Sequence, residues 1–299
     1  MELSTNNQLQ RPLEPVEEKA VSPWLEAWRS FRNNKLAVLG TLIVLFFILL
    51  AIFAPLIAPE GINEQNFEKR LLAPSSEHWF GTDDFGRDIF SRVVHGARIS
   101  LWVGFLAVTG SIVVGCLLGI LAGYYGKWVD TIISRFFDIL LAFPSILLAI
   151  AIVAVLGPSL KNALIAIAII NIPNFGRLIR SRVLSVKQEE YILAAKAVGM
   201  KNSRILFHHV MPNSIAPIIV QGTLAIATAI IEAAALGFLG LGAEAPNPEW
   251  GKMLTDSRAF LVQAPWTMIF PGLAIMLTVL GFNLMGDGLR DALDPKMKN

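Results

Sequence analysis

The sequence predicts an all-α integral membrane protein with six transmembrane helices. Of its 299 residues, 54% are hydrophobic and only 16% are charged, a balance too apolar for an ordinary soluble protein. Several runs without charged residues reach the length of about 20 helical residues that crosses a hydrocarbon core. A polar segment near the middle of the chain separates two of these runs, and it carries the strongest functional signal.

The predicted segments follow one another in a simple order. Residues 1–35 form an N-terminal tail, in which the part from Pro23 onward has Trp and Phe at helical spacing. This part is expected to lie on the membrane surface or to extend the first span. Residues 36–96 contain that span and a long polar loop, residues 97–290 contain the other five spans, and residues 291–299 form a charged tail. The six predicted spans are residues 36–59, 99–126, 139–160, 162–176, 212–231 and 259–286.

The distribution of basic residues predicts the orientation. Six spans place both termini on one side of the membrane. If that side is the cytoplasm, most of the 25 Lys and Arg residues are cytoplasmic, including those between residues 177 and 211. The loop that follows the first span is then extracytoplasmic. Residues 1–20 lack the apolar stretch of a cleavable signal peptide, so the first span is expected to act as the anchor.

Residues 189–213, called here the coupling loop, are predicted to form a helix, a turn and a second short helix. The residues from Glu190 onward are good helix formers, and Gly199 stands where a left-handed C-terminal cap would fall. Asn202 can cap the second helix, which is expected to end before Pro212. A helical hairpin at a membrane surface offers a protein outside the membrane something to bind.

Glycines in the second span predict close helix packing. Gly115, Gly119 and Gly123 recur every four residues, a stripe that lets two helix backbones approach closely. The neighbouring helix could belong to this chain or to another one. Pro144 lies inside the third span, where kinks are tolerated. Cys116 is the single cysteine, so no internal disulfide forms, and it is expected to be a packing residue.

The sequence lacks the motifs of an enzyme. No Gly-x-x-x-x-Gly-Lys-Ser/Thr loop occurs, so we expect no ATP site, no catalytic residues and no cofactor in this chain. We also expect no metal site. His208 and His209 are adjacent and point to different faces of a helix. The acidic residues near Asp84 lack the spacing of a calcium loop and are expected to form a structural turn or a docking surface.

Glu232 is the one carboxylate inside a long apolar stretch. Counting from Pro212 places it near the outer membrane face, where it could reach the interface, bond to another helix or line a substrate path. Two classes of function remain: a transport subunit driven by a cytoplasmic motor, and a self-contained secondary transporter or channel. Because the second class usually needs several ionisable residues at mid-membrane depth, the first is favoured.

The coupling loop resembles the EAA loop of permease subunits of ABC importers. Ala194 and Ala195 are followed by three residues, then Gly199, nine residues and a short apolar stretch that ends at Pro212. The family pattern has Glu where this chain has Leu193, and Glu189 or Glu190 could replace it. The resemblance implies that the loop contacts an ATPase through Glu190, Leu193, Ala194, Ala195, Gly199, Asn202, Arg204, Phe207 and Pro212.

Three further motifs, at residues 80–88, 235–242 and 283–291, are similar to the dipeptide/oligopeptide/nickel importers, and most closely to the C-type permease subunit of dipeptide transporters. This resemblance implies a five-helix permease core with one helix added before it, in a bacterial cytoplasmic membrane. Docking of another protein outside the membrane is expected at Asp83, Asp84, Arg87 and Asp88.

The resemblance also implies the partners and the activity. The expected partners are the lipid bilayer, a homologous B-type permease, two ATPase subunits that use the ATP and an extracytoplasmic solute-binding protein; no nucleic acid is expected. Uptake of dipeptides or short peptides by alternating access is expected, while glutathione and nickel chelates stay open as substrates.

Overall fold

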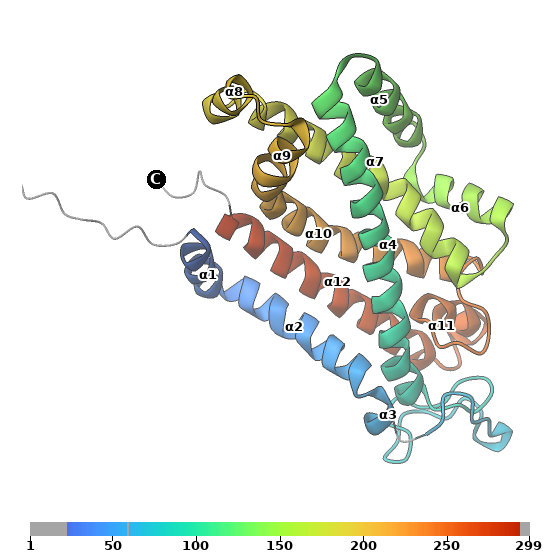
Figure 1. Ribbon diagram of the computed structural model, residues 1–299. Coiled ribbons are helices and arrows are strands. Elements are labelled where there is room, and N and C mark those ends of the chain that lie inside the picture. Colours follow the sequence, from blue (N-terminus) through green and yellow to red (C-terminus); the bar gives the residue numbers. More distant parts are fainter. Residues whose placement is uncertain (1–22, 59, 294–299) are drawn as a thin grey trace, which may run out of the picture.

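The computed structural model describes residues 23–58 and 60–293, and within them the side chains of Pro23, Trp24, Lys196, Ser203, Phe207 and Asn213 are not described. The described part of the chain contains helices and no strand, only one isolated bridge between Thr82 and Asp88. Five helices are long and apolar enough to cross a membrane, or six spans if the bent pair α5–α6 counts as one (Figure 1). The prediction of an all-α protein with six spans is therefore confirmed if α5 and α6 are counted as one span.

The helices are bounded as follows: α1 Pro23–Asn33, α2 Lys35–Ile52, α3 Ala54–Ile57, η1 Phe67–Lys69, α4 Ile89–Tyr125, α5 Lys127–Leu141, α6 Ser145–Leu156, α7 Leu160–Val186, α8 Glu190–Ala197, α9 Asn202–Ile205, the π-helical turn η2 Leu206–Val210, α10 Met211–Phe238, α11 Trp250–Ser257, η3 Arg258–Phe260 and α12 Trp266–Leu293.

The third span is the main difference from the sequence prediction. One span over residues 139–160, with a tolerated kink at Pro144, was expected, but α5 ends at Leu141 and α6 begins at Ser145 with a bend of 93° between them. Pro144 explains the break, because it has no N–H to donate and moves the residue before it out of the helical region. The fourth span, in contrast, is longer than the 15 residues expected, since α7 continues past Gly176 to Val186.

The glycine stripe packs α4 against α7 of the same chain, which answers the question that the sequence left open. A Cβ atom on Gly115 would lie 2.7 Å from the carbonyl oxygen of Ile172. A Cβ atom on Gly119 would overlap the carbonyl of Gly176, and one on Gly123 would lie 2.8 Å from the Cβ of Val183. Only glycine allows this backbone approach over more than two helical turns.

Helix α5 is held on α7 by a buried aromatic ring and two ion pairs. Phe137 is fully buried against Gly176, where a side chain would overlap the ring. The guanidinium of Arg180 donates two hydrogen bonds to Asp130, and Arg177 donates one to Asp138 at 2.7 Å. These contacts fix the helix that precedes the bend.

The motif at residues 283–291 attaches the added first span to the core. It lies in α12, and a Cβ atom on Gly288 would overlap the Cβ of Ala37 in α2. About two turns earlier along α12, Gly281 meets Ile43, and Gly40 of α2 approaches the Gly281 carbonyl. The first span therefore packs closely along α12.

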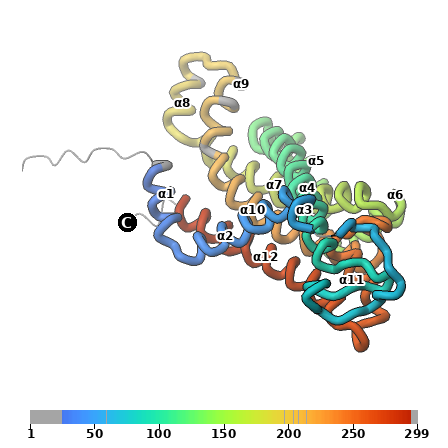
Figure 2. Tube along the Cα trace, turned by 90° about the horizontal axis from the view of Figure 1, so that it is seen from below, coloured from blue at the N-terminus to red at the C-terminus, as the bar shows by residue number. Residues whose placement is uncertain are grey.

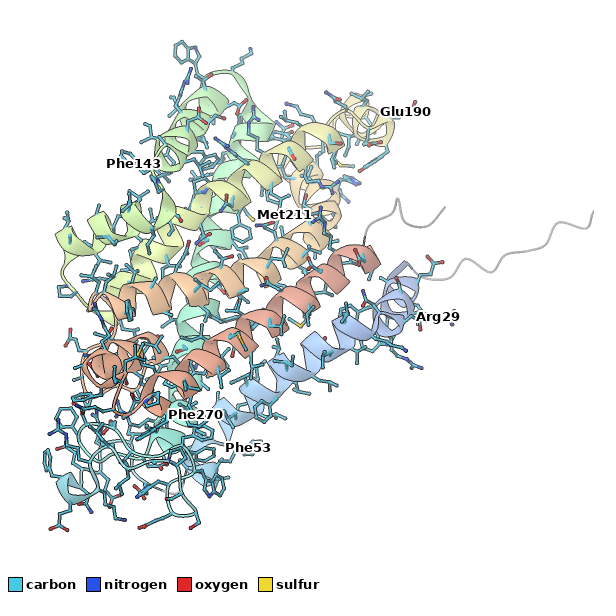
Figure 3. All side chains as sticks on the ribbon, turned by 180° about the vertical axis from the view of Figure 1, so that it is seen from behind. Arg29, Phe53, Phe143, Glu190, Met211 and Phe270 are labelled. Carbon is cyan, nitrogen blue, oxygen red and sulfur yellow. The ribbon has the colours of Figure 1, made fainter. Side chains whose placement is uncertain are left out.

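The long helices have two distinct ends. Glu190 of α8 and Arg29 of α1 lie at one end of the bundle, and Phe53 and Phe270 lie at the other (Figure 3). The view from below in Figure 2 shows α8 and α9 projecting from the bundle on the side opposite α11. The largest hydrophobic cluster lies between these ends, where α4, α6, α7 and α10 pack together around Val108, Ala166 and Ala229.

Candidate functional site: the coupling loop and two polar clusters

The backbone of the coupling loop follows the predicted helix and turn. Gly199 has φ = +80°, so the left-handed cap expected there is confirmed. The Met200 N–H donates to the Ala195 carbonyl at 3.0 Å, which closes the C-terminus of α8. The second helix differs from the prediction, because it does not end before Pro212. α9 passes through η2 into α10, and Pro212 lies in the first turn of α10, where its missing N–H costs least.

Buried aliphatic side chains anchor the loop to the bundle. Ile192 of α8, Ile205 of α9 and Val210 of η2 are each at most 1% exposed. They join a hydrophobic cluster with Val183 of α7 and Tyr124 of α4. The ammonium of Lys187 donates to the Tyr124 carbonyl at 2.8 Å, so the start of the loop is fixed to α4 as well.

The residues predicted to contact an ATPase lie on the opposite face of the loop. Seven of them have exposed side chains or, for Gly199, an exposed backbone, and Ala195 is half-buried. Phe207 lies in η2, and its side chain is outside the described part. A Cβ on Gly199 would meet nothing within 4 Å in this chain. The exposed set is Glu190, Leu193, Ala194, Gly199, Asn202, Arg204 and Pro212.

Sequence reasoning missed Val198, which is 88% exposed beside Gly199. Leu193, five residues earlier, is 54% exposed. No local signal in the sequence marked it, because the exposure of an apolar residue at a helix end is decided by how the helix packs. The loop thus has an apolar contact surface around the turn.

Glu232 lies in a buried cluster that joins three helices. It is 8% exposed, and its Oε2 accepts a hydrogen bond of 3.0 Å from the Asn171 amide of α7. The side chain of Ser145, at the start of α6, lies close to this carboxylate. Of the three roles considered for Glu232, the structure shows the bond to another helix. The interpretation in which it reaches out to the interface is wrong, and a role in the substrate path stays a prediction.

The acidic cluster at the other end of the bundle faces inward. Asp83 is 9% exposed, Arg87 5% and Asp88 2%. The Asp83 carboxylate accepts the N–H groups of Phe85 and Arg87 at 2.9 Å and the Arg87 Nε at 2.6 Å. Arg92 also approaches it, at 3.6 Å. A docking surface needs exposed side chains, so the docking role expected of Asp83, Arg87 and Asp88 is corrected to a structural one.

The start of α4 depends on the same cluster. Asp88 Oδ2 accepts the Ser91 N–H at 2.7 Å, which caps the helix, while its Oδ1 lies 3.2 Å from His78 Nδ1. His78 is buried and was not recognised in the sequence, because nothing local marks it as a partner of a residue ten positions away. Asp84 keeps some exposed surface, and burial together with the Asp83 charge raises its pKa. Docking therefore stays a prediction for Asp84.

The motif at residues 235–242 packs the end of α10 against α11. Glu249 caps α11, with Oε1 and Oε2 accepting the N–H groups of Gly251 and Lys252 at 2.8 Å. Burial raises the pKa of Glu249. A Cβ on Gly237 would lie 2.5 Å from Glu249 Oε2, and Thr255 donates to the Gly237 carbonyl at 2.9 Å.

Two family models match the chain. Residues 115–299 match the binding-protein-dependent transport system inner membrane component, and residues 22–74 match the N-terminal TM domain of oligopeptide transport permease C. The first covers more than half of the chain, and the second covers the added first span.

Curated relatives and solved structures agree with these matches. The dipeptide transport system permease protein DppC of Alkalihalophilus pseudofirmus is 69% identical over 94% of this chain and 92% of the relative. The glutathione transport system permease protein GsiD of Pectobacterium atrosepticum is 49% identical over 95% of each chain. A solved structure of the inward-facing MetNI methionine ABC transporter shares the fold, with a TM-score of 0.56 at 18% identity over 67% of this chain and 96% of that chain.

The glycine-packed core of residues 115–293, the added span on α12 and the exposed coupling loop are thus the parts of a known architecture. The chain belongs to the family of binding-protein-dependent transport system inner membrane components, and it is a multi-pass permease subunit of an ABC importer.

Proposed function

We propose that this permease subunit takes up dipeptides or short peptides by ATP-driven alternating access. The observation that carries the proposal is the 69% identity to a dipeptide transport permease over nearly the full length of both chains. A second candidate is glutathione, because glutathione permeases are 49% to 52% identical to this chain. Glutathione is itself a short peptide, so the two candidates share one substrate class.

The coupling loop would transmit the movement of an ATPase to the spans. Its outer surface, from Glu190 to Arg204, carries the contact, and its inner surface is packed on α4 and α7 through Ile192 and Ile205. Because η2 continues into α10 without a break, a displacement of the loop moves α10 as one body. Exposed Glu190 supplies the negative charge that the family pattern has at the position of Leu193.

Glu232 connects this movement to the substrate path. It lies 21 residues after the start of α10, about 32 Å along the helix at 1.5 Å per residue. Movement of α10 would strain the bond of Glu232 to Asn171 of α7 and its contact with Ser145 of α6. We infer that this three-helix cluster lies beside the path that opens and closes.

The partners would be a homologous B-type permease, two ATPase subunits and a solute-binding protein, with ATP used by the ATPase subunits alone. The proposed orientation places the coupling loop and both termini in the cytoplasm of a bacterium and α11 outside. The basic residues of α1, α7 and the coupling loop, among them Arg29, Arg182 and Arg204, support this orientation because they lie at one end of the bundle.

Uptake by a deletion strain tests the substrate. Cells that carry this chain with its partner subunits should accumulate a labelled dipeptide, and unlabelled dipeptide should compete better than glutathione or a nickel chelate. Better competition by glutathione would assign the second candidate. Competition by the nickel chelate alone would contradict the peptide proposal.

Cysteine labelling tests the orientation. Asn63, Asn247 and Asn202 are exposed, and each can be replaced by Cys in a Cys116→Ser background. Cysteines at positions 63 and 247 should react with an impermeant thiol reagent added to intact cells, whereas the one at 202 should react only after lysis. The reverse pattern would overturn the orientation.

ATP hydrolysis by the separated chain tests the division of labour. The purified permease, free of ATPase subunits, should neither bind nor hydrolyse ATP because it has no phosphate-binding loop. Turnover in such a preparation would contradict its role as a driven subunit.

A further inference from the structure

Helices α2, α4, α10 and α12 enclose an apolar groove of about 550 Å³. Its wall on α4 follows one helical stripe, and its other walls come from the last turns of α2 and from one residue each of α10 and α12. Arg98 is the one charged residue of this lining. The lining residues are Ile48, Ala51, Ile52, Arg98, Leu101, Trp102, Phe105, Ile226 and Phe282.

Arg98 lies at the mouth of the groove nearest the extracytoplasmic loop. Because α4 starts at this end of the bundle with Ile89, Arg98 precedes Trp102 and Phe105 by one and two turns. α2 runs in the opposite direction and ends here, so its last residue, Ile52, lies at the same mouth, while Ile48 lies one turn deeper. The charge is therefore at one end of the groove and the apolar lining extends inward from it.

The mouth is level with the lipid headgroups. α2 has 18 residues, or about 27 Å of helix, which nearly equals the 30 Å of a hydrocarbon core. Its final residue must then lie close to the boundary between hydrocarbon and headgroups. Trp102, which is 53% exposed, is of the type enriched at this boundary.

Arg98 differs from the other arginines at this end of the bundle. Arg87 and Arg92 pair with Asp83, and Arg70 and Arg258 lie over the rings of Phe260 and Phe238. Arg98 is exposed, and within residues 23–58 and 60–293 no acidic side chain pairs with it. An anionic phospholipid has a negatively charged phosphate and apolar acyl chains. The unpaired cation at headgroup level can bind the phosphate, and the apolar groove beside it can bind an acyl chain.

We propose that this groove binds one anionic phospholipid of the outer leaflet, with the phosphate on the Arg98 guanidinium and an acyl chain along the groove. Guanidinium groups hold phosphates through two parallel hydrogen bonds. A helix of a second protein fits the space less well. One helical turn with side chains fills roughly 500 Å³, so the groove would take little more than a single turn. An acyl chain can follow its whole length.

Lipid retention by the assembled transporter tests the headgroup contact. The complex is reconstituted in equal amounts of phosphatidylglycerol and phosphatidylcholine, purified and analysed by native mass spectrometry. Wild type should retain phosphatidylglycerol, and Arg98→Gln should retain about tenfold less, as expected for the loss of a charge-assisted contact. Arg98→Lys should retain an intermediate amount, because the charge stays and the paired hydrogen bonds do not.

Arg182→Gln is the matched control, since Arg182 is also exposed but belongs to α7 at the other end of the bundle. It should retain as much phosphatidylglycerol as wild type. Equal retention by Arg98→Gln and Arg182→Gln would overturn the proposal, and so would equal retention of the two lipids by wild type.

Tryptophan quenching tests the position of the acyl chain. Phosphatidylglycerol with brominated acyl chains should quench wild type more than Trp102→Phe, and this difference should shrink in the Arg98→Gln background. Brominated phosphatidylcholine should give a smaller difference. If a crosslinker on a cysteine at position 52 captured a second permease chain in place of lipid, the groove would be a protein interface and the proposal would be wrong.

Discussion

At one end of the helix bundle the motif residues face outward, and at the other end they face inward. In the coupling loop, Ile192 and Ile205 are buried, while the motif residues Leu193 and Gly199 are exposed. At the opposite end of the bundle the motif residues themselves are buried: Asp83 binds backbone N–H groups and arginines, and Asp88 caps α4.

This contrast teaches that a dense polar motif does not by itself mark a contact surface. Two of the three motifs of the dipeptide/oligopeptide/nickel importers that the sequence shows, at residues 80–88 and 235–242, serve to shape loops and pack α11 on α10. The coupling loop presents most of its motif residues outward. A substitution there should change transport at constant abundance, whereas one at the other end should change abundance first.

The largest effect is expected from Gly199→Asp. Because the Gly199 backbone has φ = +80°, any side chain at this position destabilises the folded chain by about 1 kcal/mol. The Asp carboxylate would also lie within the loop surface that contacts the ATPase. We expect uptake to fall at least tenfold while the chain stays inserted and abundant, with poor recovery of ATPase subunits or ATP hydrolysis without uptake. Gly199→Ala should be milder. Uptake, abundance and co-purification are measured on the same membranes.

Gly240 provides the matched control for this experiment. It has φ = +77°, is exposed and has nothing within 4 Å of a Cβ position, but it follows the far end of α10, away from the coupling loop. Gly240→Asp carries the same backbone cost and should keep most of the uptake. If Gly199→Asp also kept it, the loop would not be the coupling element.

The second prediction concerns Asp83→Ala. Removing this carboxylate leaves the buried Arg87 without its partner, which typically costs about 3–5 kcal/mol. We expect the amount of chain in the membrane to fall strongly, with uptake per remaining molecule unchanged. The double variant Asp83→Ala/Arg87→Ala should recover part of the abundance, because only Arg92, which also donates to the Ile62 carbonyl, then loses its carboxylate partner. Normal abundance with lost uptake would mean that the buried cluster acts in transport after all.

Glu232→Gln should have a smaller effect. The amide oxygen of Gln can still accept the hydrogen bond from Asn171, so the cluster between the two ends should persist. We expect uptake to fall by no more than a few fold at normal abundance. Complete loss would show that the negative charge itself is needed in the substrate path.

The smallest effect is a pH dependence due to Glu249. Burial raises its pKa above the ordinary 4.5, so from about pH 4.5 up to the raised pKa the folded chain binds more protons than the unfolded one. Stability should therefore fall as the pH rises through this window and become constant above it. The melting temperature of Glu249→Gln should lack this slope. An identical slope in both proteins would assign it to other groups.

The sequence by itself determined the helical and membrane character of the chain and the local geometry of the coupling loop. Apolar runs report on single helices, and a left-handed cap depends on a few adjacent residues, which is why Gly199 could be identified. The motifs around it were enough to place the chain among the ABC importer permeases, although they did not show which motif faces inward.

The tertiary structure alone decided where distant residues meet. The bond from Asn171 to Glu232 joins positions 61 residues apart, and the α4 stripe finds its neighbour on α7 some 57 residues later. The 93° bend between α5 and α6 depends on Pro144 and on the packing of Phe137 of α5 against Gly176 of α7. The burial of Asp83, and the lack of an acidic partner for Arg98 among the residues that the structure describes, likewise depend on which side chains the fold brings near each charge. Pairing and burial are properties of assembled surfaces, and no local pattern in the sequence encodes them.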